Sequence, residues 1–192
     1  MKKTLTGLFI AALVAFPVFA AFPKLEAGST APKFEARASL AGEEFDYSLG
    51  DELENGPVVV YFYPSAYTRG CNIQAHEFAV NMDKFKAAGA SVIGVSLDSI
   101  ERLNDFSADP EYCAGELSVA SDETGDIAKS FGLEVRGPRD GMKDTRGVEV
   151  NHGFAERTTF IVKSDGDVSE VIGGISPMEN VQKSLEAVQN LK

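Results

Sequence analysis

A proline followed by six β-branched or aromatic residues, Pro57 to Tyr63, constrains the fold of this chain more than any other feature. The run has no polar alternation, so it predicts a strand buried on both faces, which is typical of the sheets of α/β proteins. A turn follows Pro64, and from Cys71 onward apolar residues recur at helical spacing until Gly89, which is expected just beyond the helix end. Cys71 therefore falls in the first turn of a helix that follows a central strand.

The rest of the chain alternates between the two strand and helix patterns. We expect further strands over 90–97, 117–120, 157–163 and 168–172. Helices are expected to begin at Asp98-Ser99-Ile100-Glu101, to span 123–131 and to follow Ser176-Pro177. An amino-terminal hairpin is expected over 34–47. This order predicts one α/β domain with a thioredoxin-like fold, in which helices flank a central mixed sheet and the hairpin is an extension. The Gly-rich, charged stretch 134–155 is predicted to be a long loop beside the functional site.

The first twenty residues have the pattern of a secretory signal peptide. Met1-Lys2-Lys3 precedes an apolar run from Leu8 to Phe16, and small residues surround Ala20, after which we place the cleavage. A retained membrane anchor is the alternative, although Pro17 and the Ala-rich end argue against it. We therefore expect a signal peptide over 1–20, a domain over 21–192, a periplasmic location and no membrane contact after cleavage.

The charge balance argues against anionic partners. The chain has 18 Lys and Arg against 29 Asp and Glu, a net charge of −11, and loss of Lys2 and Lys3 with the signal peptide would give 16 − 29 = −13. Such a surface repels phosphate backbones, so we expect no nucleic-acid binding. No Cys or His pair has the spacing of a zinc site, and we expect no metal and no cofactor.

Cys71 is the clearest candidate for a chemically reactive residue. A thiol at a helix start faces backbone N–H groups without intrahelical partners and the positive end of the helix dipole, both of which stabilise the thiolate. A thiolate is the reactive form of cysteine, so the position favours a nucleophile. An isolated Cys at a helix start can also be a packing residue, so the choice between packing and catalysis depends on the residues around it.

Those residues resemble a known family. Pro64-Ser65-Ala66-Tyr67-Thr68-Arg69-Gly70-Cys71 is similar to the P-x-x-x-T-x-x-C signature of the peroxiredoxins, and the likeness continues at Gly94–Asp98 and at Arg157–Val162. The resemblance implies a thiol peroxidase that reduces hydrogen peroxide and organic hydroperoxides. Cys71 would then be oxidised to a sulfenic acid. Thr68 would hydrogen-bond the thiolate and the peroxide, Pro64 would shield the pocket, and Arg157 would polarise both.

The sequence around Cys71 resembles most closely the bacterioferritin-comigratory, or peroxiredoxin Q, branch. Many members of that branch carry a second cysteine five residues after the nucleophile, and this chain has His76 there. The remaining candidate is Cys113, in a region where other members place the resolving thiol, so we interpret Cys113 as the partner in an intramolecular disulfide. A structural disulfide or a spare thiol remains possible, because connectivity is not written in a sequence.

Several alternatives stay open at this stage. Arg157 could form an ordinary strand-end ion pair, and His76 or His152 could tune a thiol. A periplasmic thiol–disulfide oxidoreductase of the thioredoxin class normally needs C-x-x-C, whose first position is Thr68 here, and a non-enzymatic metal-handling protein on this fold would need a cysteine pair. As partners we expect a hydroperoxide and a thiol reductant, either a protein or a small thiol, and a monomer or weak dimer.

Overall fold

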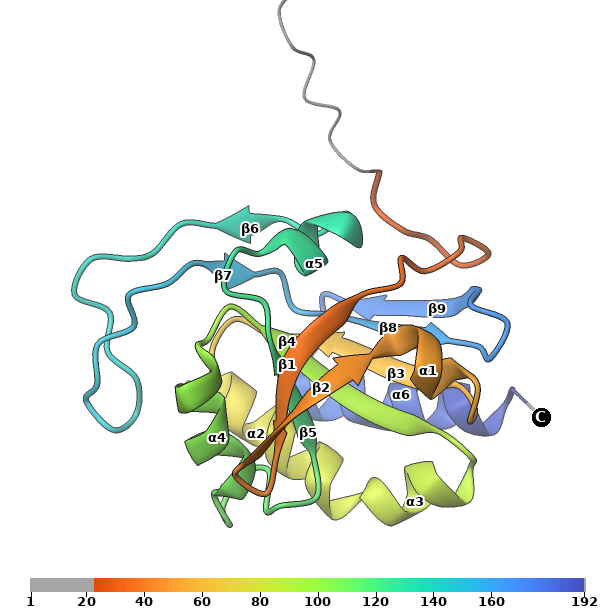
Figure 1. Cartoon of the computed structure of the whole chain (residues 1–192), viewed down its shortest axis with the longest axis horizontal. Coiled ribbons are helices and arrows are strands. Elements are labelled where there is room, and N and C mark those ends of the chain that lie inside the picture. Colours follow the sequence, from red (N-terminus) through yellow and green to blue (C-terminus); the bar gives the residue numbers. More distant parts are fainter. Residues whose placement is uncertain (1–22, 192) are drawn as a thin grey trace, which may run out of the picture.

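A computed structural model describes residues 23–191 of the chain, so the expected signal peptide over 1–20 lies outside the described residues. One sheet of seven strands runs in the order β2-β1-β5-β4-β3-β8-β9 (Figure 1). β3 pairs in parallel with β4, and β4 with β5, whereas the other neighbours are antiparallel. The strands are β1 (Glu35–Leu40), β2 (Glu43–Ser48), β3 (Val58–Phe62), β4 (Ser91–Ser96), β5 (Ser118–Ser121), β8 (Thr158–Val162) and β9 (Val168–Gly173).

Helices cover both faces of this sheet, which confirms the predicted thioredoxin-like architecture. The helices are α1 (Leu49–Leu53), α2 (Arg69–Val80), α3 (Met82–Ala87), α4 (Ile100–Ala108), α5 (Asp126–Ser130) and α6 (Pro177–Gln189). Every residue of β3 is buried. Val59 and Tyr61 pack with α2, α3, α4 and α6, whereas Val58, Val60 and Phe62 pack with α1 and α5 on the opposite face. The unbroken apolar run of β3 follows from this burial on both sides.

The single helix expected from Cys71 to Gly89 is wrong in one respect, because two helices occupy the segment. α2 ends at Val80, α3 begins at Met82, and Asn81 between them has φ −104° and ψ 5°. The Asn81 side chain donates to the Glu77 carbonyl oxygen at 2.8 Å. Asparagine competes with the helical backbone in this way, and the apolar spacing alone did not reveal the break.

The segment 134–155 is the irregular part of the domain. Its ends pair as the two-stranded sheet of β6 (Val135–Arg136) and β7 (Phe154–Ala155), and an isolated antiparallel bridge joins Lys143 to Glu149. The remainder projects beyond the main sheet as an extended loop (Figure 1).

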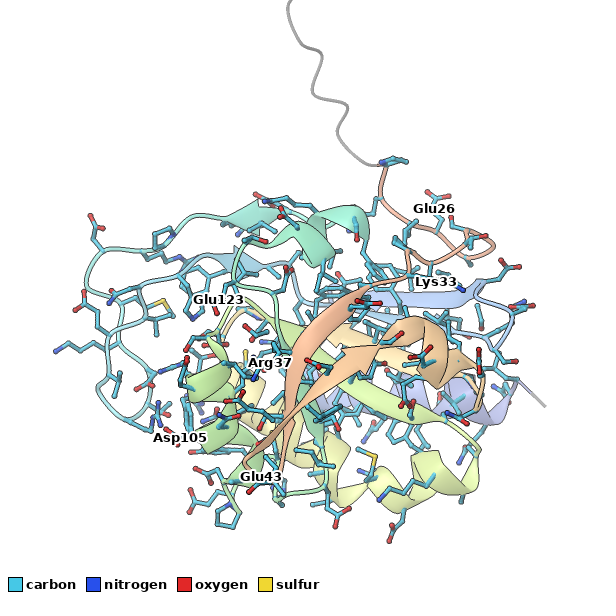
Figure 2. All side chains as sticks on the ribbon, in the orientation of Figure 1. Glu26, Lys33, Arg37, Glu43, Asp105 and Glu123 are labelled. Carbon is cyan, nitrogen blue, oxygen red and sulfur yellow. The ribbon has the colours of Figure 1, made fainter. Side chains whose placement is uncertain are left out.

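Charged side chains such as Glu43, Asp105 and Glu123 lie around the outside of the domain (Figure 2). Within residues 23–191, no helix is both long and apolar enough to cross a membrane.

Candidate active site

Cys71 lies where the sequence placed it, in the first turn of the helix that follows the central strand. β3 ends at Phe62, α2 begins at Arg69, and Cys71 is the third helical residue, with 2% of its surface exposed. Thr68 is the residue that caps the helix, but its side chain forms no capping hydrogen bond. The thiol therefore sits at the amino end of α2, where the helix dipole stabilises an anion.

Arg157 comes to the same place through the register of the sheet. β8 is antiparallel to β3, and Thr158 lies opposite Phe62, so Arg157 stands beside the turn that leads to α2. Its Nη2 lies 3.2 Å from the Cys71 sulfur. A Cβ atom at Gly70 would lie only 3.3 Å from the same Nη2, so the glycine leaves room for the guanidinium group.

The other end of the Arg157 guanidinium group is held by buried polar side chains. Its Nη1 donates to Gln74, whose amide donates to Asn180 Oδ1 at 2.9 Å, and Thr159 donates to the same oxygen at 2.7 Å. Arg157 forms no ion pair with a carboxylate of residues 23–191, so the strand-end ion pair is not what the structure shows. Sequence reasoning missed Gln74 and Asn180, although Gln74 lies on the apolar face of its helix, three residues after Cys71.

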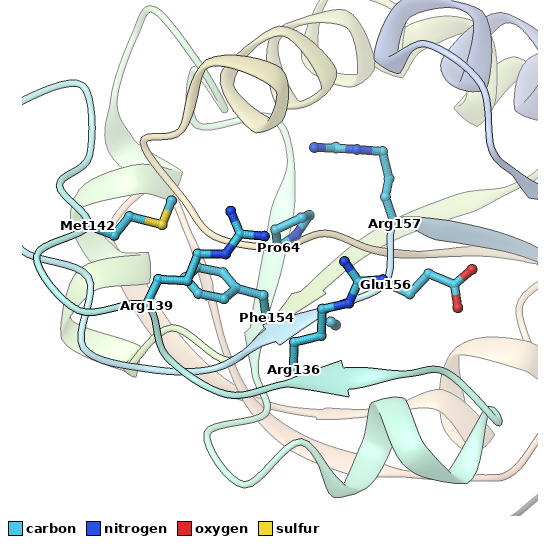
Figure 3. Close-up of a pocket in the computed structure, with 8 residues that line it drawn as sticks. Pro64, Arg136, Arg139, Met142, Phe154, Glu156 and Arg157 are labelled. Carbon is cyan, nitrogen blue, oxygen red and sulfur yellow. The ribbon is translucent and has the colours of Figure 1, made fainter.

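Thr68 and Pro64 both lie in the loop between β3 and α2. The Thr68 hydroxyl donates to the Ser65 carbonyl oxygen at 2.8 Å, and within the described residues it does not bond to the Cys71 sulfur. A hydroxyl that donates in this way keeps a lone pair free to accept a further hydrogen bond. Pro64 lines a pocket that also contains Arg157 (Figure 3).

Asp98 holds the loop between β3 and α2 through hydrogen bonds, a role that the sequence did not reveal. Its side chain is fully buried, and we expected it only at a helix start. The cap of α4 is instead Ser99. Five groups donate to the Asp98 carboxylate: Ser65 Oγ (2.9 Å), the Ala66 backbone N–H (2.8 Å), Ser96 Oγ (2.7 Å), Arg102 Nε (2.8 Å) and His152 Nε2 (2.8 Å).

The same cluster connects the long loop to the segment 64–71 around Cys71. Arg102 Nη2 donates to the Ala66 carbonyl oxygen at 2.9 Å and to Asp144 of the long loop at 2.8 Å. Two groups of Thr145, its backbone N–H and its hydroxyl, donate to the Tyr67 carbonyl oxygen at 2.9 and 2.8 Å. The loop from β3 to α2 and the segment 134–155 are therefore held together by part-buried hydrogen bonds, of which those of Arg102 are charge-assisted.

Asp98 and His152 have reciprocal effects on each other's ionisation. Burial raises the pKa of Asp98, but the hydrogen bond and charge of His152, with bonds from Ala66 and Ser96, outweigh it and leave the pKa below its ordinary value. Burial lowers the pKa of His152, but the hydrogen bond and charge of Asp98 outweigh it, so the pKa of the imidazole is raised. The two groups thus favour an imidazolium–carboxylate pair.

Cys113 lies in the turn between α4 and β5 and is not bonded to Cys71. Both thiols are free and buried, and both belong to the hydrophobic cluster on the α2 and α4 face of the sheet. Burial, followed by the nearby charge of Asp109, raises the pKa of the Cys113 thiol. The raised pKa favours the protonated form of the Cys113 thiol, and the described residues show no structural disulfide.

The two histidines differ in their surroundings. His76 is exposed, and its Nδ1 lies 3.1 Å from the Glu111 carbonyl oxygen. His152 belongs to the long loop and reaches Asp98 and, at 3.3 Å, the hydroxyl of Ser65. The hydrogen bonds of His152 thus reach the motif around Cys71, and no feature of its sequence neighbourhood predicted that contact.

A cysteine at a helix start, in contact with an arginine and without a second cysteine in the same turn of the helix, is typical of a thiol-based redox enzyme on a thioredoxin-like fold. Comparison with known proteins agrees with the assignment to thiol-based redox enzymes.

Residues 27–171 match the AhpC/TSA family. The chain is 34% identical to peroxiredoxin Bcp of Escherichia coli K12 over 147 residues, which cover 77% of this chain and 85% of the relative. It is 31% identical to the chloroplastic peroxiredoxin Q of Sedum lineare over 172 residues, covering 89% and 82%.

A solved structure extends the likeness to the fold. The crystal structure of peroxidoxin BcpB from Mycobacterium tuberculosis superposes with a TM-score of 0.71 and 28% identity, covering 88% of this chain and 99% of that one. The chain therefore belongs to the AhpC/TSA family, the peroxiredoxins, and is a thiol peroxidase with likeness to the Bcp and peroxiredoxin Q members. Proteins of this family act on hydroperoxides and are reduced by thiol partners.

Proposed function

We propose that Cys71 is the nucleophile that reduces hydrogen peroxide and organic hydroperoxides. The observation that carries this proposal is the 3.2 Å contact between Arg157 Nη2 and the Cys71 sulfur at the amino end of α2. A guanidinium group is permanently charged and stabilises the thiolate, which is the nucleophilic form. Burial strengthens this interaction because little water screens the charges.

Attack of the Cys71 thiolate on one peroxide oxygen forms an S–O bond and breaks the O–O bond. The departing oxygen carries negative charge until it takes a proton and leaves as water or an alcohol, and Cys71 becomes a sulfenic acid. Arg157 is placed to stabilise that developing charge, and Thr68 has a hydroxyl that can both donate and accept. Pro64 lines the pocket on the side of the loop and limits access of water.

We propose that Cys113 resolves the sulfenic acid. Attack of the Cys113 sulfur on the Cys71 sulfur would form a disulfide and release water. Two external thiol groups, from one dithiol protein or from two small molecules, would then restore both cysteine thiols and leave as a disulfide. The two free, buried thiols in one hydrophobic cluster support an intramolecular step. Because the Cys113 thiol is fully buried, the turn that carries it has to open locally before reaction.

Two variants test these roles. Wild-type protein should consume peroxide in repeated turnovers with a thiol donor, and Cys71→Ser should consume none. Cys113→Ser should consume one equivalent and then accumulate a Cys71 sulfenic acid that dimedone traps, as measured by peptide mass mapping. Turnover in Cys71→Ser would contradict the nucleophile, and an unchanged cycle in Cys113→Ser would contradict the resolving role.

We also propose that residues 1–20 direct export to the periplasm. The AhpC/TSA match begins at residue 27, so the basic and apolar leader precedes the family region. Expression of the full chain followed by cell fractionation and amino-terminal sequencing tests this. Mature protein should begin at Ala21 in the periplasmic fraction, and an intact Met1 terminus in the cytoplasm would contradict export.

A further inference from the structure

Beside Cys71 lies a pocket whose charge is opposite to that of the chain. Its volume is about 290 Å³. Figure 3 shows Arg136, Arg139 and Arg157 reaching toward the space around Pro64. Three guanidinium groups thus line one cavity of a protein whose net charge is −11. Clefts lined by one sign of charge concentrate ligands of the opposite sign.

Two of the three arginines already form hydrogen bonds with neighbouring groups of the protein. Arg136 donates to the Glu134 carboxylate at 3.1 and 2.9 Å, and Arg157 bonds to Cys71 and Gln74. The one carboxylate that lines the pocket, Glu156, accepts from Lys24 at 2.9 Å.

Arg139 remains without a carboxylate partner among residues 23–191. Its guanidinium carbon lies 5.7 Å from the centre of the Phe154 ring. This cation–π contact favours one position of the exposed side chain without neutralising its charge.

The pocket is also larger and more apolar than hydrogen peroxide requires. A water molecule occupies about 30 Å³ in the liquid, so the cavity corresponds to roughly ten waters, whereas hydrogen peroxide is roughly the size of two. Met142, Phe154 and Pro64 supply apolar surface along its wall. Hydrogen peroxide is neutral and would leave both the apolar wall and Arg139 unused.

The wall that carries Arg139 is held in place before any ligand binds. The Met142 backbone N–H donates to the Arg139 carbonyl oxygen at 3.1 Å, and the Val150 N–H donates to the Met142 carbonyl oxygen at 2.9 Å. The same segment is tied to the motif around Cys71 through Asp144 and Arg102. A site that is organised in advance loses less free energy on ordering when it binds.

We propose that this pocket selects organic hydroperoxides that carry a carboxylate on an apolar body. Arg139 binds the carboxylate, Phe154 and Met142 contact the hydrocarbon, and the peroxide group lies near Arg157, which belongs both to the pocket and to the Cys71 contact. This inference rests on the proposed role of Cys71. Reaction breaks the O–O bond, and the product leaves as the alcohol with its carboxylate unchanged. Arg139 is thus a specificity-determining residue.

Two hydroperoxides of nearly equal shape test the inference: cumene hydroperoxide and its para-carboxylate derivative. The rate constant for Cys71 oxidation by each is measured on the mature protein by rapid quench and mass spectrometry. In the wild type the carboxylate should react about tenfold faster, the ratio that one charge-assisted hydrogen bond supports. In Arg139→Gln the ratio should fall to about one or below, because the net negative charge of the protein then repels the anion.

Lys143→Gln is the matched control, because Lys143 is exposed in the same loop, does not line the pocket, and changes the charge equally. It should keep the wild-type ratio. The wild-type ratio should also fall when salt is raised to about 0.5 M, a measurement that needs no variant. A wild-type ratio of one or less, or an unchanged ratio in Arg139→Gln, overturns the inference. Failure of every hydroperoxide, including hydrogen peroxide, to oxidise Cys71 would instead refute the proposed function on which it rests.

Discussion

Replacing Asp98 by asparagine should destabilise the protein strongly. The Asp98 carboxylate accepts five hydrogen bonds, and two donors, Arg102 and His152, are charged or favoured in the charged form. An asparagine of the same shape offers one oxygen and places an NH₂ group against donors such as the Ala66 N–H at 2.8 Å. The variant would thus leave buried donors unpaired.

Removing one partner of a buried ion pair typically costs about 3–5 kcal/mol, because the other charge remains buried without compensation. Arg102 keeps Asp144 as a partner, which limits the loss, whereas His152 loses its only carboxylate within residues 23–191. We therefore expect a loss of about 3–5 kcal/mol, which lowers Tm by about 6–20 °C in a domain of this size.

Urea unfolding at pH 7 with a reductant present, followed by far-UV circular dichroism, measures this loss. Asp105→Asn is the matched control: Asp105 lies on α4, exposed and without a side-chain hydrogen bond among the described residues (Figure 2). It should change the free energy of unfolding by less than about 0.5 kcal/mol. If Asp98→Asn unfolds with the slope of the wild type and loses less than about 1 kcal/mol, the cluster does not stabilise the fold and the reasoning is wrong.

Two further predictions concern the same core. Because Asp98 raises the pKa of His152 above 6.5, the stability from this pair is present below that pH and is lost as the pH rises through the folded pKa. The free energy of unfolding of the wild type should thus fall as the pH rises above about 6.5, and a fall of equal size in His152→Asn would contradict the pairing. Gly94→Ala should cost about 1–3 kcal/mol by overpacking, since its Cβ would lie 2.5 Å from the Tyr61 hydroxyl, whereas Gly137→Ala, with nothing within 4 Å, should be near neutral in the same urea assay.

The sequence predicted the elements of the fold because their signals are local. The apolar run of β3, the Ser176-Pro177 start of α6 and the position of Cys71 at a helix start are all written in neighbouring residues. The break at Asn81 was missed because a single polar residue, rather than a change of period, causes it. Thus a periodic pattern fixes the type of an element better than its continuity.

The polar contacts of the site could not be predicted because they join residues that are far apart in the chain. Arg157 and Cys71 are 86 positions apart, and their meeting depends on the antiparallel register of β8 on β3. Only the family signature pointed to that pair, and no signature pointed to His152, whose partner Asp98 is 54 positions away in the segment that precedes α4. A stretch without periodicity gives no indication of which residues it will contact. The segment 134–155 is such a stretch, yet it supplies both His152, which contacts Asp98, and Arg139, which lines the pocket. Arg139 lines the pocket and is exposed, so an exchange there should alter substrate choice more readily than the fold, whereas an exchange of His152 should alter stability.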